Sequence, residues 1–500
     1  MTTNHIDVTR LDELLKGFPS VDLNQLENLK ISGISLDSRK IKKGFLFCAL
    51  KGEKVDGNDF IEEAFKRGAV FCLTDNKNST HLINTFYIHD LRKHLGVISS
   101  KFYDHPSNKL KAFAVTGTNG KTSCVSFISQ IAKLLNSQCG HISTIDISIN
   151  GKDLESSSLT TPESIELQKY FSEMVRVESS LVAFEASSHG LEQYRLTGTS
   201  IDTAILTSFS CDHLDFHKTI NNYKKAKKRL FTELKPKNII LNIDNILGEE
   251  IYKELIKEKE SCKFFSVSEE KDADFQYSFS RNNKGKIEVK LKTLEKEVLF
   301  KLNTVSRPLA SNVICALAAF LSSGFNLDGV YQNLEKLTFP KGRMDLIKLD
   351  EKNKCYIDYA HTPEALETSL IELREAYKES KIWCVFGCGG ERDKEKRPKM
   401  GELAELLSDF LVITNDNPRM ENELQIIEEI TGGMKEKKRC KIIPDRRKAI
   451  LHCLNEMKTH KSKNILLIAG KGHEEYQDIL GKKIQLSDHN LVKDFILSAK

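Results

Sequence analysis

The stretch AFAVTGTNGKTSCVSFISQIAKLL, residues 112–135, decides the fold class of this chain. Its apolar opening, Ala112 to Thr116, predicts a buried strand, and the Phe-, Ile- and Leu-rich end predicts a helix. A strand, a tight loop and a helix in that order begin a parallel βαβ unit. We therefore expect an α/β fold whose central sheet is parallel.

The turn between this strand and helix has the composition of a phosphate-binding loop. It consists of Gly117, Thr118, Asn119, Gly120, Lys121 and Thr122. Glycines let backbone N–H groups approach phosphate oxygens, while Lys121 supplies a cation and Thr122 a hydroxyl for magnesium. The strict Gly-x-x-x-x-Gly-Lys-Ser/Thr pattern would need glycine at Val115, so the loop is a shorter variant. A chance Gly-Lys-Thr turn is the alternative, and the flanking strand and helix disfavour it.

Apolar runs on either side of the loop predict three domains. The runs at 181–187, 203–209 and 238–244 continue the central parallel sheet, and Lys284 to Lys301 is expected to form an edge hairpin. Three later runs, each followed by a polar or glycine-rich loop, predict a second parallel sheet. We therefore predict a P-loop-type central domain at residues 108–338 and a Rossmann-like α/β domain at residues 339–500.

The first part of the chain, residues 1–107, predicts a small α/β domain. It contains short strands with glycine turns, an amphipathic helix from Phe60 to Arg67 and a strand at 69–74. A turn-rich stretch at 104–108 separates it from the central domain. Because the three domains surround one site, we expect hinges near residues 104–111 and 338–343.

Composition excludes several function classes. The chain has 500 residues, 40% hydrophobic and 29% charged, with no run of ~18 apolar residues that could span a membrane. Met1 to Arg10 lack the pattern of a secretory signal, so we expect a cytoplasmic protein whose twelve cysteines are reduced. The 75 basic and 70 acidic residues are too nearly balanced to indicate nucleic-acid binding. We expect a monomer.

The phosphate loop resembles that of the Mur ligases and of the folylpolyglutamate synthases. Further segments resemble the Mur ligases, in chain order: DSRKIKKGFLFCALKGEKVDGNDF, LTTPES, FEASSHGLEQYR, SCDHLDFHKTINNYKKAKKRLF, PKGRMD, DYAHTPEAL, VFGCGGERDKEKRPKMG, NDNPRMEN and AGKGHEEYQ. They extend from Asp37 to Gln477, which is nearly the whole chain. Their joint order makes the resemblance specific.

The resemblance implies an ATP-dependent ligase that forms an amide bond in peptidoglycan synthesis. A carboxylate of UDP-N-acetylmuramoyl-L-alanyl-D-glutamate would take a phosphoryl group from ATP, and an amine would attack the resulting acyl phosphate. Because carboxylate and triphosphate repel each other, the site needs Mg²⁺ and fixed cations.

The same resemblance assigns roles to individual residues. Lys121, Lys227 and His213 are expected to be catalytic, and Thr122, Glu185, His213 and Lys227 (as a carbamate) to hold metal. The expected ATP contacts are the six residues of the phosphate loop with Asn312, Arg343, Asp358 and His361. The segment before Asn312 departs from the family's Phe-Asn-x-x-Asn form, which leaves the adenine contacts open. Ser38, Thr160, Thr161, Ser187, Gln193 and Arg195 are expected to bind the UDP-linked substrate. His213 on its own is also compatible with a structural histidine.

Lys227 stands out within a basic run. A helix from Tyr223 to Phe231 would place Tyr223, Ala226, Lys227, Leu230 and Phe231 on one face. Lys227 would then point inward, whereas the other four basic residues of the run would be solvated. The family carries a carbamylated lysine at the matching position. The alternatives are an ordinary basic helix face or an unmodified lysine that contacts phosphate.

The loop Asp416-Asn417-Pro418-Arg419 indicates which amine is added. In the family this sequence marks members that add meso-diaminopimelate, whereas lysine-adding members lack the arginine. Diaminopimelate carries a second terminal carboxylate, with which a guanidinium pairs bidentately. Arg392, Gly470 and Glu474 are expected to complete this site, with Glu474 on the distal ammonium. A surface Asp-Asn-Pro turn is the alternative.

Three other functions remain open at this point. The same ligase could add L-lysine, or the chain could be a folylpolyglutamate synthase-like ligase. The latter resembles this chain only from the phosphate loop onward, so the roughly 110 residues before the loop argue against that reading. A non-catalytic nucleotide-binding switch would have no need of Glu185, His213 and Lys227 together. The ligase reading predicts that Lys121, Lys227 and Arg419 open onto one cavity.

Overall fold

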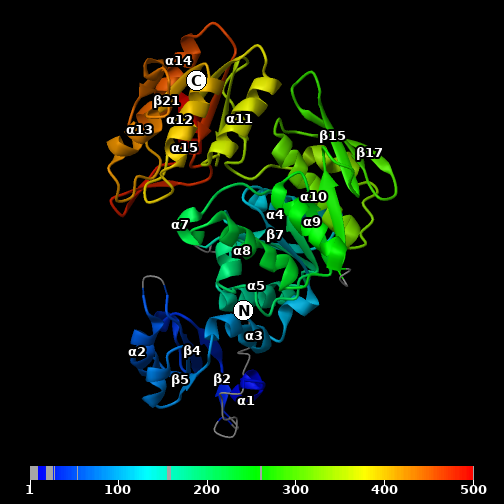
Figure 1. Ribbon diagram of the computed structural model, residues 1–500, viewed down its shortest axis with the longest axis vertical. Helices are drawn as coiled ribbons and strands as arrows, with labels where there is room; N and C mark the ends of the chain where they lie inside the picture. Colours follow the sequence, from blue (N-terminus) through cyan, green and yellow to red (C-terminus); the bar gives the residue numbers. More distant parts are fainter. Residues whose placement is uncertain are drawn as a thin grey trace.

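The computed structural model describes residues 9–18, 26, 29–52, 55–154, 159–258 and 262–498. The three largest sheets follow one another along the long axis of the molecule, from the N-terminal part at one end to the C-terminal part at the other (Figure 1). Each lies within one of the three predicted domains, and the predicted α/β class is confirmed. In this part of the chain no helix is both long and apolar enough to cross a bilayer.

The N-terminal sheet is small and entirely parallel. Its strands, in spatial order, are β3 (Gly33–Ser35), β4 (Phe45–Ala49), β5 (Ala69–Thr74) and β6 (Thr85–Tyr87). The helix predicted at Phe60 to Arg67 is α2 (Ile61–Lys66), preceded by a 3-10 turn at Gly57–Phe60. Helix α3 (Leu91–Phe102) buries Leu95 and Ile98 and leads into the central sheet.

The central sheet has eleven strands with a parallel core. In spatial order they are β10 (Lys152–Leu154), β9 (Ile147–Ile149), β8 (Cys139–Ile142), β11 (Leu181–Glu185), β7 (Lys111–Thr116), β12 (Thr203–Leu206), β13 (Asn238–Asn242), β14 (Lys263–Ser268), β15 (Phe275–Arg281), β16 (Ile287–Lys292) and β17 (Glu297–Leu302). Strands β8 to β15 of this order are parallel, and β16 pairs antiparallel with β17. The predicted edge hairpin is therefore confirmed.

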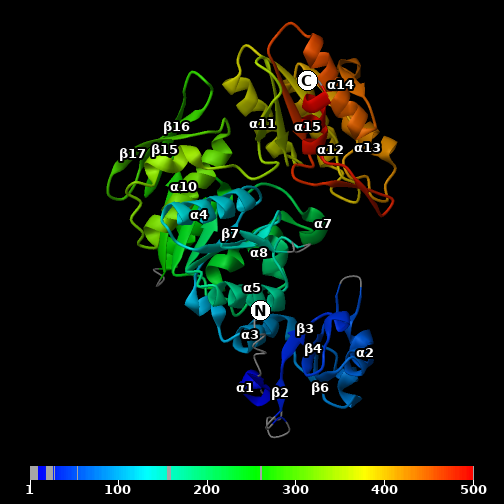
Figure 2. The same cartoon turned by 180° about the vertical axis from the view of Figure 1, so that it is seen from behind.

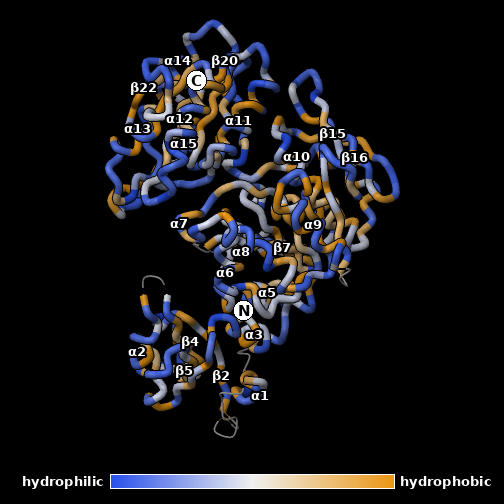
Figure 3. Tube along the Cα trace, viewed as in Figure 1, coloured by the Kyte–Doolittle hydropathy of each residue, from blue (hydrophilic) through white to orange (hydrophobic). Residues whose placement is uncertain are grey.

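Helices cover both faces of the central sheet (Figure 2). On one face, α4 (Lys121–Leu134) packs with α10 (Arg307–Ser322) in a core that includes Phe113, Val115 and Phe127. On the other face lie α5 (Ser164–Arg176), α8 (Ile220–Thr232) and α9 (Ile246–Glu258). The apolar strands run through the middle of this arrangement (Figure 3), as expected for a parallel sheet buried on both sides.

The C-terminal sheet has the order β18 (Asp345–Lys348), β19 (Asn353–Asp358), β23 (Asn464–Ala469), β20 (Lys381–Phe386), β21 (Phe410–Ile413) and β22 (Cys440–Ile442), and only β18 is antiparallel. Its helices are α11 (Pro363–Ala376), α12 (Lys396–Leu407), α13 (Glu423–Thr431), α14 (Arg446–Thr459) and α15 (Asp488–Ser498). The carboxyl ends of β20, β21 and β23 carry the loops that contain Arg392, Arg419 and Glu474.

Candidate active site

The phosphate loop is shaped by two glycines. Gly120 has φ +88° at the amino end of α4, a conformation that disfavours any side chain. A Cβ on Gly117 would lie 2.1 Å from the Thr207 hydroxyl, and a Cβ on Gly120 2.5 Å from Oδ1 of Asn312. Both glycines thus allow close packing, and Asn312 on α10 is held directly against the loop.

This loop lies between two cavities. One, of about 270 Å³, is lined by Asn119, Gly120, Asn312, Arg343 and Asp358, all predicted ATP contacts. The other, of about 810 Å³, is lined by Lys121, Lys227 and His213. It also receives predicted substrate residues from other segments: Thr160, Ser187, Gln193, Arg195 and Arg392. Residues of one loop thus line both the smaller cavity, which contains predicted ATP contacts, and the larger polar cavity.

Lys227 and Lys121 meet at the base of the loop. The Nζ of Lys227 donates to the Gly117 carbonyl at 2.7 Å, and the Nζ of Lys121 donates to the same oxygen at 2.8 Å. Lys227 is 1% exposed. Burial, reinforced by the charge of Lys121, holds the pKa of Lys227 well below its usual range, which favours a neutral amine. Burial also lowers the pKa of Lys121.

The inward face predicted around Lys227 is confirmed: Tyr223, Ala226, Lys227, Leu230 and Phe231 are the buried residues of α8. The prediction that its neighbours are solvated is wrong for three of them. Lys224, Lys228 and Arg229 are half-buried and ion-paired, with Glu250, Glu254 and Glu233 respectively. A partner helix, α9, supplies two of these carboxylates, which residue spacing within α8 could not reveal.

Glu185 ends β11 beside the phosphate loop. Its Oε1 accepts hydrogen bonds from the Thr122 hydroxyl at 2.8 Å and from the Thr144 backbone N–H at 2.7 Å. Its Oε2 is buried and has no hydrogen-bond partner. A buried, unpaired carboxylate oxygen next to a hydroxyl is the oxygen donor set that Mg²⁺ prefers. Glu185 and Thr122 therefore fit a magnesium ion at the phosphates.

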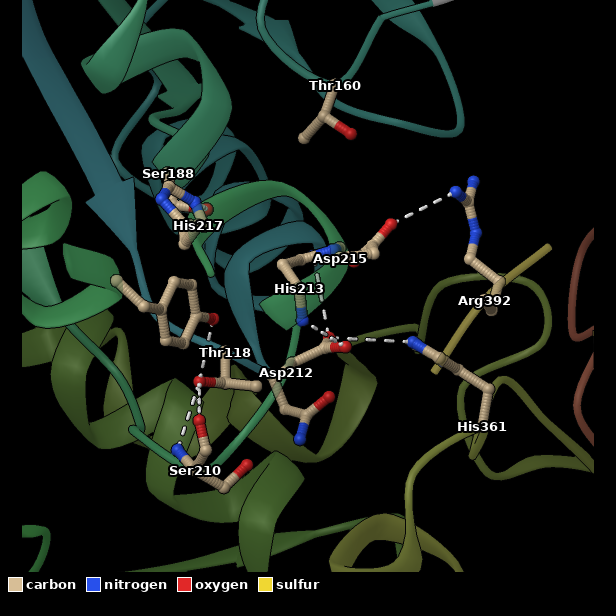
Figure 4. Close-up of polar contacts among 12 residues, drawn as sticks. Thr118, Thr160, Ser188, Ser210, Asp212, His213, Asp215, His217, His361 and Arg392 are labelled. Atoms are coloured by element: carbon tan, nitrogen blue, oxygen red, sulfur yellow. Dashed lines mark hydrogen bonds and ion pairs between the residues drawn. The ribbon is translucent and has the colours of Figure 1, made fainter. Parts of the chain in front are cut away.

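His213 lies on the cavity wall among other titratable groups (Figure 4). Burial lowers its pKa to about 3, so the imidazole is neutral and able to bind a cation. Its Nε2 lies 3.4 Å from Oδ2 of Asp212. The same oxygen lies 3.8 Å from Nε2 of His361, which belongs to the C-terminal part. His361 thus faces Asp212 and is not among the residues that line the smaller cavity, unlike the other predicted ATP contacts Asn312, Arg343 and Asp358.

A second contact joins the central and C-terminal parts across the larger cavity. Arg392 donates to Asp215 at 3.4 Å, although the two residues are 177 positions apart (Figure 4). Arg392 therefore brings a C-terminal cation to the cavity that holds Lys121 and Lys227.

His217 gives this region an acid-sensitive stability. Its Nε2 forms a hydrogen bond of 3.0 Å with the Ser188 hydroxyl. Burial, together with the nearby His189 and Lys227, lowers the pKa of His217 to about 4. An unfolded histidine titrates near ~6.5, so stability is full above that pH and is lost as the pH falls from ~6.5 towards 4. We expect His217→Gln to reduce this loss, by up to ~1.4 kcal/mol per pH unit.

Hydrogen exchange of α8 at pH 7 and pH 5, measured by mass spectrometry, checks this expectation. His81→Gln, at an exposed position, is the matched control and should leave the pH dependence unchanged. If the protection of α8 against exchange falls equally between pH 7 and pH 5 in wild type and in His217→Gln, the assignment is contradicted.

The remaining residues predicted for the UDP-linked substrate form a connected group. Thr161 is fully buried, donates to the Glu185 carbonyl at 2.7 Å and contacts the Ser187 hydroxyl at 3.0 Å. Arg195 donates to the Thr161 carbonyl at 2.7 Å and pairs with Glu163 at 3.1 Å. Thr161 thus supports the cavity wall from behind.

Ser38 lies elsewhere, in the 3-10 turn Ser38–Lys40 of the N-terminal part, and is buried. Its neighbours Asp37 and Lys40 line a separate cavity of about 680 Å³, closed on the other side by residues of α5 such as Glu166. Lys40 and Glu166 form an ion pair of 3.1 Å between the two parts. A ligand that filled both this cavity and the larger one would extend past Glu163, which lines both.

The residues predicted to bind the amino acid gather at the carboxyl ends of β21 and β23. Asp416, Asn417 and Pro418 are buried. The Asn417 side-chain NH₂ donates to Glu474 Oε2 at 2.7 Å. A Cβ on Gly470 would lie 2.5 Å from the Asp416 carboxylate, so only glycine fits there.

The expectation that Arg419 shares the cavity of Lys121 and Lys227 is wrong: Arg419 is not among its lining residues. Its guanidinium donates to the Gly390 carbonyl at 2.7 Å, and its backbone is held by Asp478 and Leu480. These contacts keep it against the glycine turn after β20. The C-terminal cation that does reach the cavity is Arg392.

Several residues at these sites escaped the sequence reasoning. Lys51 and Arg92 bring two cations from the N-terminal part to the large cavity, and Tyr359 stacks on Arg343 at 4.5 Å. Lys51 follows the carboxyl end of β4, which is a signal that could have been used. Nothing in the local pattern identifies Arg92.

Comparison with known proteins supports one family for the whole chain. Models described as the Mur ligase family catalytic domain, the Mur ligase middle domain and the Mur ligase glutamate ligase domain match residues 30–117, 115–320 and 342–472. The chain is 34% identical over 493 residues to UDP-N-acetylmuramoyl-L-alanyl-D-glutamate--2,6-diaminopimelate ligase of Haemophilus influenzae, covering 95% of this chain and 98% of that protein.

The protein of the same name from Rickettsia prowazekii is 38% identical over 486 residues, with coverage of 95% and 98%. A solved structure of a UDP-N-acetylmuramoyl-L-alanyl-D-glutamate--2,6-diaminopimelate ligase superposes with a TM-score of 0.71 at 29% identity, covering 98% of this chain and 99% of that one. The similarity extends over all three sheets.

Proposed function

The chain belongs to the Mur ligase family, and from this premise we propose how its residues carry out an ATP-dependent ligation. The protein joins 2,6-diaminopimelate to UDP-N-acetylmuramoyl-L-alanyl-D-glutamate in peptidoglycan synthesis, with ATP as cosubstrate. The observation that supports the mechanism is that residues of the phosphate loop line both the smaller and the larger cavity.

ATP binds in the smaller cavity, where Asn312, Arg343 and Asp358 surround the nucleoside and the loop receives the phosphates. The UDP end of the acid substrate occupies the cavity beside Asp37 and Lys40. Its peptidyl end extends past Glu163 to Thr160, Ser187 and Arg195. The substrate carboxylate then meets the terminal phosphate next to Lys121 and Lys227. In this proposal each cavity is lined by residues from at least two of the predicted domains, 1–107, 108–338 and 339–500.

Charge neutralisation makes the phosphoryl transfer possible. Lys121, freed from the loop carbonyls that it contacts here, turns to the phosphates, and Arg195 and Arg392 offset the charge of the acid substrate. Thr122, Glu185, His213 and the Lys227 carbamate would hold Mg²⁺, which would supply the positive charge that the triphosphate needs. The amine then attacks the carbonyl carbon of the acyl phosphate, and phosphate leaves.

The magnesium assignment predicts a selective defect in Glu185→Gln. Glutamine keeps an oxygen that accepts from Thr122 and Thr144 but removes the charge that attracts the metal. We expect the Mg²⁺ concentration for half-maximal activity to rise by ~10-fold or more, as expected for loss of a charge-assisted contact. Mg²⁺ titrations of initial rates check this. Glu192→Gln, which removes a half-exposed partner of Arg229, is the control, and an unchanged Mg²⁺ requirement in Glu185→Gln would contradict the assignment.

Folylpolyglutamate synthase-like activity is the principal alternative, and one assay separates the two. The purified protein is incubated with ATP, Mg²⁺ and either UDP-N-acetylmuramoyl-L-alanyl-D-glutamate with diaminopimelate or a folate with glutamate, and ADP release and amide product are measured. The proposal expects product only from the first pair. Product from the folate, or ATP binding without product from either pair, would refute it.

A further inference from the structure

Lys471 is a lysine with no exposed surface in the loop after β23. Lysine is rarely buried completely unless its charge is matched. Its Nζ donates to Glu474 Oε2 at 3.0 Å, to Asn417 Oδ1 at 3.4 Å and to the Tyr476 carbonyl. One buried ammonium thus connects the loop after β21, the loop after β23 and the start of β24 (Tyr476–Ile479).

The contacts of Lys471 fix how Glu474 is presented. Oε2 of Glu474 accepts hydrogen bonds from the Lys471 Nζ and from the Asn417 side-chain NH₂, the latter at 2.7 Å. In the part of the chain that the structure describes, no hydrogen bond reaches Oε1 of Glu474, and the side chain is 20% exposed. The protein therefore holds one carboxylate oxygen and leaves the other for a ligand.

The orientation of the Asn417 carboxamide depends on the same lysine. Oδ1 of Asn417 accepts from the Asp478 backbone N–H at 2.9 Å as well as from Lys471, so both donors require an oxygen at this position. The NH₂ group must then face Glu474. Without Lys471, only the Asp478 backbone N–H would favour this orientation of the Asn417 amide over the flipped one.

We propose that Lys471 is a positioning residue for the incoming amino acid, holding Asn417 and Glu474 so that the free oxygen of Glu474 receives the distal ammonium of a diamino acid. This inference rests on the proposed function and adds a residue to it. Lys471 itself does not touch the reacting atoms. Its role predicts an effect on the amino-acid substrate and none on ATP or the UDP-linked acid.

The test measures the KM of each substrate and kcat for wild type and Lys471→Met, which keeps the length of the side chain without its charge. We expect the KM for diaminopimelate to rise by about 10- to 100-fold, the size of a lost charge-assisted contact. The KM values for ATP and for the UDP-linked acid should stay within about twofold. Lys348→Met, which removes an exposed partner of Glu351, is the matched control and should change none of them.

A second variant tests whether Lys471 acts through Glu474. If it does, Lys471→Met should add little to the KM defect of Glu474→Gln when the two are combined. Lys471→Gln repeats the measurement if the methionine variant does not fold. Equal rises in all three KM values, or a defect that multiplies fully with that of Glu474→Gln, would overturn the inference. Failure of the proposed function is distinguishable, because wild type itself would then form no amide with diaminopimelate.

Discussion

Lys227→Ala is expected to lower kcat on the order of 10³-fold, the scale on which removal of one preorganised charged group acts on phosphoryl transfer. Lys227 and Lys121 both donate to the Gly117 carbonyl, and burial lowers the pKa of Lys227, which favours its neutral amine. A neutral amine adds to carbon dioxide, with loss of one proton, to give a carbamate. That reaction converts a lysine into a carboxylate-like metal ligand beside the phosphate loop.

Lys227→Arg separates this proposal from a lysine that contacts phosphate directly. Arginine keeps the positive charge but does not form the carbamate, so it should be as inactive as alanine. Bicarbonate depletion should lower the wild-type rate, and added bicarbonate should restore it. Lys228→Ala, one position along α8 on the outward side, is the control and should change kcat less than about twofold, as is typical of surface ion pairs. An active Lys227→Arg enzyme would favour the direct phosphate contact.

Diaminopimelate is expected to exceed L-lysine in kcat/KM by about 10⁴-fold. A site built around a polar group rejects the analogue that lacks it, because its own charges are then left unpaired. Arg419 provides a cation in the same loop as Asn417, and lysine lacks the distal carboxylate that would pair with it. Parallel measurements with both amino acids give the ratio.

Arg419→Met should reduce this discrimination by about 100-fold, because it lowers kcat/KM for diaminopimelate and leaves kcat/KM for lysine unchanged. Arg447→Met, at an exposed position on α14, is the matched control. Arg419 does not line the cavity of Lys121 here, so we propose that the C-terminal domain closes to bring its site to the acyl phosphate. Comparable kcat/KM values for the two amino acids in wild type would contradict the assignment of Arg419.

The sequence predicted what depends on local periodicity and on strand ends. The buried face of α8, including Lys227, follows from the 3.6-residue period, and the phosphate loop, Glu185 and the Asp416 loop lie where parallel strands end. Glycines 117 and 120 were identified because phosphate loops need backbone without side chains.

Contacts between domains were beyond the reach of such patterns. The approach of His361 to Asp212 and of Arg392 to Asp215 joins segments more than a hundred residues apart, and neither position is apolar or periodic. The complete burial of Lys471 also depends on the tertiary fold, because Asn417, which is 54 positions away along the chain, supplies one of its three acceptors. Arg419 was placed in the wrong cavity because the position of the glycine turn after β20 depends on the tertiary fold.

Transfer of the γ-phosphoryl group of ATP to the substrate carboxylate, at the junction of the two cavities, is the central claim. It is tested most directly with UDP-N-acetylmuramoyl-L-alanyl-D-glutamate in which both oxygens of the reacting carboxylate are ¹⁸O. The carboxylate oxygen forms the bond to phosphorus, and the C–O bond breaks when the amine attacks. Mass spectrometry of the released inorganic phosphate should therefore find one ¹⁸O atom for each amide formed. Amide formation with unlabelled phosphate would contradict the account.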